Sequence, residues 1–350
     1  VNTITAVYKY ADLLRASIAH AGNDHRLGAN EAPPAIISVF IGEALTKLLN
    51  QIANGKKTDD AAVKRALDLI SKLPNLELDN TDRNRTSPFA FTGNKFEIRA
   101  VGSSQNCAGP MTAMNTMMAL QLIEFKSDVD KLTSKGTDKE EAILMVLKNY
   151  IRKSKAILFE GNNYSDEWKA EAAARGLNNF ANTPEALDVL GSKLAMDFYG
   201  KSGVMNNIEL EAFYAVQLHI YNTKLSIEAK TLEEMVLSIV MPAVIRYQTE
   251  LAQNIAAMKA IDMGEAVGYQ KDKLKQLVKC TTTIDESLDK MLKFLDKAHH
   301  AGNVREEAEI LCTNVKPQMD HIREAVDNLE AIVDDQYWPL VKYRELLFVR

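Results

Sequence analysis

Arginines and single carboxylates gather in two stretches in the first third of the sequence. The first stretch reads HRLGANEAPPAI and covers residues 25–36, and the second reads DRNRTSPFAFTGNKFEIR and covers residues 82–99. Guanidinium groups bind phosphate and carboxylate through paired hydrogen bonds, and carboxylate oxygens bind divalent cations. These residue types predict a site that holds an anionic substrate, a phosphate and a metal ion together. The residues concerned are Arg26, Glu31, Arg83, Arg85, Glu97 and Arg99.

Two strand-like runs in the second stretch, Phe-Ala-Phe-Thr and Lys-Phe-Glu-Ile-Arg, are joined through Gly93 and the asparagine that follows it. Such a pair readily adopts positive φ in a tight turn, so the stretch predicts a β-hairpin. Because side chains alternate along a strand, Phe96 and Ile98 should share one face, and Glu97 and Arg99 the other, roughly 7 Å apart. The two charged groups could pair with each other on the surface, or hold a metal ion and an anionic substrate. The residue types leave both interpretations open.

The segments around the two stretches are predicted to be mostly helical. Apolar spacing predicts a helix over residues 3–19, and a proline pair in the first turn favours another from about residue 35 to residue 53. A third helix is expected over residues 59–72, and a fourth leads from the hairpin to about residue 126. We take the two stretches, which these helices flank in the sequence, as the part of the protein that carries the chemistry.

From residue 127 onward the sequence indicates helix almost throughout. Apolar side chains recur every three or four residues, for example at Ile284, Leu288, Met291 and Leu295, which is typical of an antiparallel bundle. Pro242 lies inside such a run and predicts a kink near Val240. The expected fold class is α+β, with a sheet-and-helix domain over residues 1–126 and an all-α helical domain over residues 127–350.

Bulk composition excludes several classes of function. A net charge of -5 and a pI near 5.8 argue against a nucleic-acid or anionic-membrane surface, and no apolar run approaches the roughly 20 residues of a membrane helix. Three cysteines, far apart and odd in number, indicate no disulfide or zinc framework. We expect a cytoplasmic protein. The start at Val1, inside a predicted helix, indicates a fragment of a longer chain.

The histidines do not predict a metal site. His299 and His300 are adjacent, which points them in different directions on a helix, and His219 and His321 have no partner at a clean four-residue spacing. An exposed helix end is the favoured interpretation for this group. His25 stands beside Arg26 in the first stretch and is a weaker candidate for a ligand contact.

Three motifs in a fixed order resemble those of glutamine synthetase, in particular the long type III form. Commoner members of the family carry an Arg-Leu segment followed by Glu-Ala-Pro, then Arg-Asn-Arg-Ser, then a Glu-x-Arg strand. This sequence has Arg26-Leu27 with Glu31-Ala32-Pro33, then Arg83-Asn84-Arg85-Thr86, then Glu97-Ile98-Arg99. The resemblance is specific over about residues 22–118. It implies that residues 1–126 belong to the catalytic domain, with a type III insert at about residues 37–80.

The resemblance also implies a role for each matching residue. Glu31 matches a flap glutamate that helps to take a proton from the attacking ammonium, and Arg26 and Arg99 match arginines that hold the substrate glutamate. Arg85 matches the arginine that contacts the transferring phosphate, and Glu97 matches a ligand of a divalent cation. The implied cofactors are ATP with Mg²⁺ or Mn²⁺. Arg83 is placed with Arg85 on the ATP and phosphate side.

The sequence departs from the family pattern at one point in the hairpin. Commoner forms place a further arginine on the nucleotide side, at the position that is Ala90 here, and no arginine occurs between Arg85 and Arg99. Lys95 is the candidate substitute for that ATP contact. The upstream part that such an enzyme needs, with most of its metal-ligating glutamates, is expected to be absent from this chain.

The resemblance therefore implies that this chain is part of an ATP-dependent glutamate–ammonia ligase that forms glutamine through γ-glutamyl phosphate. A related ligase of the same fold that joins glutamate to another amine is the alternative within enzymes. A catalytically silent helical oligomerisation or interaction module is the alternative outside them. Family members form rings stacked into dodecamers, so the resemblance implies a homo-oligomer. The expected partners are glutamate, ammonia, ATP and further copies of the chain, and neither nucleic acid nor a membrane is expected.

Overall fold

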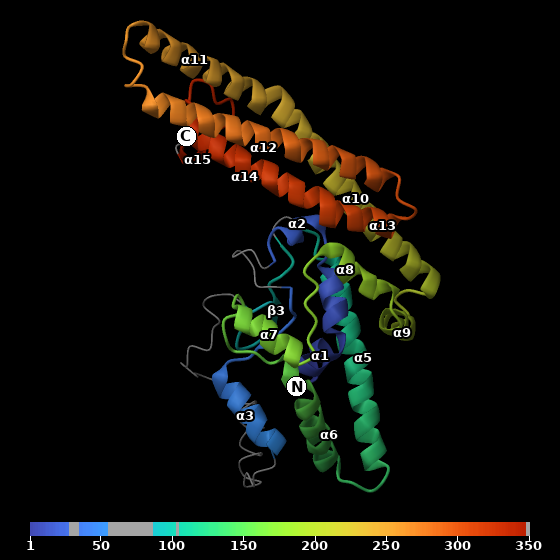
Figure 1. Ribbon diagram of the computed structural model, residues 1–350. Helices are drawn as coiled ribbons and strands as arrows, with labels where there is room; N and C mark the ends of the chain where they lie inside the picture. Colours follow the sequence, from blue (N-terminus) through green and yellow to red (C-terminus); the bar gives the residue numbers. More distant parts are fainter. Residues whose placement is uncertain (28–34, 55–86, 103–104, 348–350) are drawn as a thin grey trace. The chain divides into compact units, whose positions relative to one another are not determined.

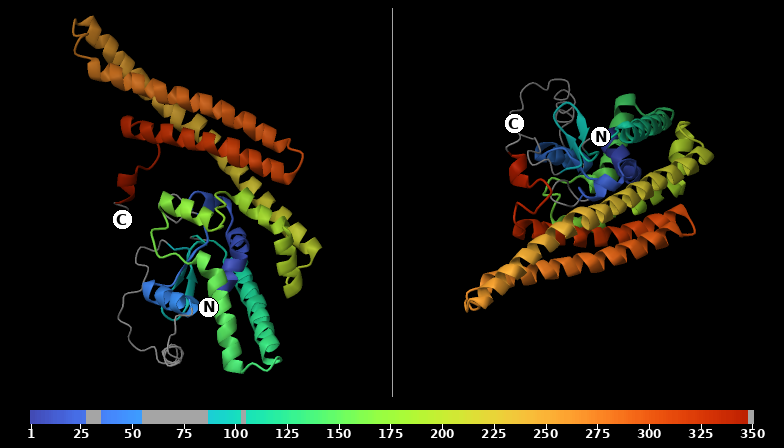
Figure 2. Two further views of the ribbon diagram at one scale, coloured as in Figure 1. Left: turned by 60° about the horizontal axis from the view of Figure 1, so that its bottom comes forward. Right: turned by 90° about the horizontal axis from the view of Figure 1, so that it is seen from above.

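The computed structural model describes residues 1–27, 35–54, 87–102 and 105–347 (Figure 1). The chain divides into two compact units, Val1–Gln217 and Leu218–Arg350. Figure 2 shows the same chain from two further directions. The boundary at residue 126 stays a prediction; a single helix, Ala108–Thr133, runs through that position.

Three helices form the largest helical layer of the first unit: α1 (Asn2–Ser17), α5 (Ala108–Thr133) and α6 (Lys139–Ser154). Each packs against the other two, and an apolar cluster of Val129, Ala142, Val146 and Tyr150 lies between α5 and α6. α6 begins where it does because the Asp138 carboxylate accepts hydrogen bonds from two backbone amides of the first turn. α5 continues past the predicted end near residue 126.

A small sheet carries the predicted hairpin. Its strands are β1 (Val39–Phe40), β2 (Phe89–Phe91) and β3 (Phe96–Ile98), in the order β1-β2-β3. β2 pairs with β1 in parallel and with β3 antiparallel. On its other side β1 is held by the chain after α6, where the amide of Phe159 donates to the carbonyl of Val39 at 3.1 Å.

The predicted helix from residue 35 to residue 53 is wrong in its first half. Residues 39–40 form β1, and the helix that follows, α3, covers only Glu43–Asn54. Ile36, Ile37 and Val39 are all buried, and their β-branched side chains favour a strand over a helix. Gly42 separates the two elements with φ at 84°. The start of the predicted insert therefore belongs to the sheet.

Short elements complete the first unit. They are α2 (Ala21–Asp24), the 3-10 turn Lys155–Ile157, α7 (Asp166–Ala174), α8 (Thr183–Asp188), the 3-10 turn Val189–Gly191 and α9 (Lys193–Ser202). Trp168 of α7 is buried and stacks on Phe159, with ring centroids 3.7 Å apart. α10 (Asn207–Met235) begins in this unit and continues into the second.

The second unit is a set of long helices. Its elements are α11 (Met241–Ala260), α12 (Gly268–His299), α13 (Val304–Ile310), α14 (Lys316–Ile332) and α15 (Tyr343–Leu346). α12 packs against both α11 and α14 (Figure 1). The predicted apolar stripe Ile284, Leu288, Met291 and Leu295 is buried, which confirms that face of α12.

Two π-helical segments interrupt the second unit, Val236–Val240 and Leu311–Val315. Each ends directly before a helix that has proline in its first turn, Pro242 in α11 and Pro317 in α14. Proline lacks an N–H group and its ring crowds the preceding turn, and the wider π turn relieves that crowding. The kink predicted near Val240 corresponds to a π-helical segment that ends at that residue. The second segment was not predicted, although Pro317 stands in the same relation to it as Pro242 does to the first.

The described part of the chain is helix-rich with one small three-stranded sheet, which agrees in outline with the predicted α+β class. Among the described residues, no helix is both long enough and apolar enough to cross a membrane.

Candidate active site

The β2–β3 hairpin forms where the sequence predicts it. Gly93 has φ at 96°, a left-handed conformation that glycine adopts without strain, and the Thr92 amide donates to the Lys95 carbonyl at 2.9 Å. The antiparallel register places Ala90 opposite Glu97. Residues opposite each other in such a pair share one face of the sheet.

The apolar face of the hairpin is built from aromatic rings. Phe96 packs against Phe89 and Phe91, with ring centroids 5.4 and 5.1 Å apart. Contacts of this kind fix the register of the two short strands. They also confirm that Phe96 faces away from the charged side chains.

Three charged side chains line the opposite face of β3. Lys95 Nζ lies 3.2 Å from one carboxylate oxygen of Glu97, and Arg99 Nη2 lies 3.5 Å from the other. The Lys95 side chain is 65% exposed, that of Glu97 36% and that of Arg99 17%. Ion pairs that are open to solvent hold their partners loosely, so one partner can be exchanged for a ligand.

The charge state of Glu97 suits a metal ligand. The hydrogen bond from Lys95, together with the charge of Arg99, lowers the pKa of the Glu97 carboxyl below its usual range. The carboxylate is therefore ionised at neutral pH, which is the form that binds Mg²⁺ or Mn²⁺. The Glu97 carboxylate lies between the positive charges of Lys95 and Arg99, and these two charges could also bind an anionic substrate.

Arg26 is tied to the segment that follows β3. Its Nη1 donates to the Oδ1 atom of Asn23 at 3.0 Å, and Nδ2 of the same amide donates to the carbonyl of Ala100 at 2.9 Å. Ala100 is the next residue after Arg99. The structure thus connects the two predicted glutamate-binding arginines through one buried side chain.

His20 makes a second connection between the same two segments. Its Nδ1 accepts a hydrogen bond from the backbone amide of Asn23 at 3.2 Å, which assigns the proton to Nε2. Nε2 lies 3.3 Å from the carbonyl oxygen of Val101. Sequence analysis missed both His20 and Asn23. Histidine is not a common helix cap, so its position before α2 gave little signal.

Several predicted residues lie outside the described residues, namely Glu31, Arg83 and Arg85. Most of the predicted insert, from residue 55 to residue 80, also lies outside them. His25 is described and is exposed at the end of α2. The structure therefore brings together Lys95, Glu97 and Arg99 and links Arg26 to them.

No complete metal site is found in the described part of the chain. Among those residues, no group of three or more His, Cys, Asp or Glu side chains is arranged to hold an ion. His299 and His300 lie at the exposed end of α12, as the favoured interpretation had it, whereas His219 and His321 are exposed within α10 and α14 and not at a helix end.

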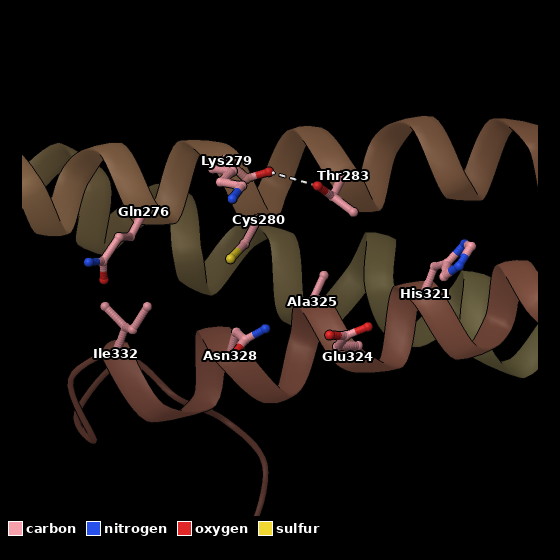
Figure 3. Close-up of a pocket in the computed structure, with 9 residues that line it drawn as sticks. All are labelled: Gln276, Lys279, Cys280, Thr283, His321, Glu324, Ala325, Asn328 and Ile332. Carbon is pink, nitrogen blue, oxygen red and sulfur yellow. Dashed lines mark hydrogen bonds between the residues drawn. The ribbon is translucent and has the colours of Figure 1, made fainter.

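A cavity of about 410 Å³ lies between α12 and α14, away from the charged residues of the hairpin in the sequence (Figure 3). Cys280, Thr283, His321 and Glu324 are among the residues that line it. Burial raises the pKa of the Cys280 thiol, which keeps it protonated and a poor nucleophile. This cavity contains none of the predicted site residues.

Comparisons with known proteins give the family of the chain. A family model described as "Glutamine synthetase C-terminal domain" matches residues 142–259. A glutamine synthetase of Bacteroides fragilis (strain YCH46) is 43% identical over 358 residues, which cover 100% of this chain and 49% of that protein. A type-3 glutamine synthetase of Dictyostelium discoideum is 38% identical over 353 residues, which cover 99% and 48%. A glutamine synthetase of Butyrivibrio fibrisolvens is 34% identical, with 99% and 49% covered.

The chain belongs to the glutamine synthetase family. The match to the type-3 enzyme confirms the resemblance to the type III form that the three sequence motifs indicated. The chain spans about half the length of the curated relatives it matches.

Proposed function

We propose that this chain forms part of a glutamate–ammonia ligase, which makes glutamine from glutamate and ammonia at the expense of ATP, through γ-glutamyl phosphate. Membership of the glutamine synthetase family supports the reaction class. The observation that carries the proposal is the charged face of β3, where Lys95, Glu97 and Arg99 lie together. Arg26 is held against the residues directly after that strand.

The proposed roles follow from the charges of the reacting groups. A phosphoryl group that leaves ATP spreads negative charge over its oxygens, and fixed guanidinium groups stabilise that charge. Arg85 and Arg83 are proposed for the phosphates, with Lys95 as a further ATP contact. Arg26 and Arg99 are proposed for the substrate glutamate, because a planar guanidinium binds a carboxylate through two parallel hydrogen bonds.

Glu31 is proposed as the group that takes a proton from the attacking ammonium. It stands in the stretch after Arg26, between a Gly-Ala-Asn run and two prolines. A loop of this kind that closes over bound glutamate would exclude water from the acyl phosphate.

Glu97 is the described residue that fits a divalent cation, since its carboxylate is ionised and partly exposed. A bound Mg²⁺ or Mn²⁺ would neutralise charge on the ATP phosphates. Glu97 would provide one oxygen ligand. The remaining ligands are proposed to come from the part of the enzyme that this chain does not include.

By family, we propose a cytoplasmic homo-oligomer, a dodecamer of stacked rings, that uses glutamate, ammonia and ATP. A ligase that joins glutamate to another amine would use the same face of β3 for the same phosphate and glutamate contacts. The identity of the amine that is joined to glutamate is therefore determined by experiment, in which ammonia and small alkylamines are compared as acceptors.

The test is an assay of γ-glutamyl transfer and of glutamate-dependent ATP hydrolysis, with Mg²⁺ or Mn²⁺ supplied. It is run on this chain and on the complete gene product that contains it. We expect activity in the complete product, with ammonia preferred over methylamine, and none in this chain alone. Absence of glutamate-dependent ATP hydrolysis in a folded complete product would contradict the proposal.

A further inference from the structure

Asn23 is a polar side chain with no exposed surface and a full set of partners. Its Nδ2 donates to the carbonyl of Ile18 at 2.7 Å and to that of Ala100 at 2.9 Å. Its Oδ1 accepts from Nη1 of Arg26 at 3.0 Å. A buried amide satisfied in this way is rigid, because any rotation breaks at least one bond to a group that cannot reach water.

Gly102 closes the other side of the Arg26 guanidinium. A Cβ atom at this position would lie 3.0 Å from Nη1 of Arg26 and 3.3 Å from Oδ1 of Asn23. Gly102 also has φ at 91°, a conformation that side chains disfavour. A side chain here would therefore force the Arg26 guanidinium or the Asn23 amide to shift by a few tenths of an ångström.

The two segments meet over three consecutive residues. Asn23 bonds to the carbonyl of Ala100, His20 reaches the carbonyl of Val101, and Gly102 faces Arg26. These contacts join the end of α1 and the short helix α2 to the chain directly after β3. They tie the Arg26 guanidinium to the backbone that directly follows Arg99.

We infer that Asn23 is a positioning residue, which fixes the Arg26 guanidinium relative to the strand that carries Arg99, and that Gly102 leaves the space this requires. The inference rests on the proposed function, in which both arginines hold the substrate glutamate. Asn23 touches neither substrate nor nucleotide in this role. It acts through Arg26, so its effect falls on glutamate binding and leaves ATP binding unchanged.

The first test compares two alanine substitutions in the complete gene product. Asn23→Ala removes the acceptor for Arg26, and Asn163→Ala is the matched control, because Asn163 is 1% exposed and bonds to Ser38 instead. Without its acceptor the Arg26 guanidinium is free to leave the position in which it would bind the glutamate carboxylate; a tenfold loss of affinity corresponds to about 1.4 kcal/mol. We expect the KM for glutamate to rise by about tenfold or more in Asn23→Ala, with the KM for ATP within about twofold of wild type.

The second test uses a pair of glycines with the same backbone conformation. Gly102→Ala and Gly136→Ala both place a methyl group at φ 91°, but the one at Gly136 meets nothing within 4 Å. We expect the KM for glutamate to rise only in Gly102→Ala. If Asn23→Ala does not fold, this pair alone tests whether the placement of Arg26 sets the KM for glutamate.

A double-mutant cycle separates positioning from general destabilisation. In an Arg26→Ala background, Asn23→Ala should have little further effect on the KM for glutamate, since the group it positions is gone. A merely structural lesion would lower the active fraction, and so kcat, in either background. An unchanged KM for glutamate in folded Asn23→Ala and Gly102→Ala would overturn the inference. An active wild-type enzyme in the same assay would still support the proposed function. An inactive wild type would overturn both.

Discussion

Ala90 lies directly opposite Glu97 in the β2–β3 pair, so its methyl group is on the same face of the sheet as the Glu97 carboxylate. Ala90 has no exposed surface, whereas Lys95, two residues before Glu97 on that face, is largely exposed. Commoner members of the family, by the resemblance, have an arginine at the position of Ala90. A closed position 90 and an open position 95 favour Lys95 as the residue that supplies this positive charge.

Restoring the arginine at position 90 should damage the fold. Ala90→Arg inserts a long charged side chain where no space is open, and we expect the free energy of unfolding to fall by about 1–3 kcal/mol. Urea denaturation measures the change. Ala173→Arg, at an exposed position of α7, is the control and should be nearly neutral. Equal stability of the two variants would show that position 90 has room.

Removing the positive charge at position 95 should weaken nucleotide binding. We expect Lys95→Ala to raise the KM for ATP by about threefold to tenfold in the complete gene product, and Lys95→Arg to retain most of the affinity, because a positive charge near phosphate is what matters. Steady-state kinetics with ATP varied gives both values. Lys126→Ala, which removes an exposed lysine of α5, should leave the KM for ATP as it is. A wild-type KM in Lys95→Ala would remove Lys95 from the site.

Arg99 should be essential to synthesis and dispensable for folding. It lies on the charged face of β3 and makes its ion pair with Glu97 there, so Arg99→Ala opens no hole on the aromatic face. We expect glutamine formation to fall below about 1% of wild type, with a melting temperature within a few degrees of wild type. Arg323→Ala in α14 controls for loss of a paired arginine. Normal turnover in folded Arg99→Ala would refute its assignment to glutamate.

The protonated form of Asp12 should stabilise the folded chain more than its ionised form does. Burial raises the pKa of the Asp12 carboxyl, although Asn178 donates to it at 2.8 Å. A carboxyl with a raised folded-state pKa stabilises below its ordinary value of 3.8 and loses that contribution as pH rises through the folded-state value. We therefore expect Asp12→Asn to raise the melting temperature at pH 7 and to have less effect near pH 4.

The control for Asp12 is Asp166, whose pKa is shifted in the opposite direction. Asp166 has its pKa lowered by a hydrogen bond from Lys169, so its contribution is present above the ordinary value and lost as pH falls. Asp166→Asn should lower the melting temperature slightly at pH 7 and not at pH 3. Melting curves of the three proteins across this range give the comparison. Parallel curves for wild type and Asp12→Asn would contradict the shift at Asp12.

The sequence was sufficient wherever a local pattern decides the structure. Gly93 between two alternating runs predicted the hairpin and its two faces, and the three-and-four spacing predicted the buried stripe of α12. β1 could not be found in this way, because two residues carry no periodicity and the strand exists only by pairing with β2. Asn23 was missed for a related reason. Its role comes from Ala100 and Gly102, which are far from it in sequence and reach it only through the fold.

The two π-helical segments have a consequence for how this chain is compared with its relatives. A π turn contains one residue more than the α-helical turn it replaces, so each segment amounts to a single-residue insertion that the helix absorbs without a loop. The phase of the apolar stripe changes by about one residue across Val236–Val240 and again across Leu311–Val315. In family alignments, one-residue gaps should therefore be tolerated at these two places inside helices, most readily in relatives that lack Pro242 or Pro317.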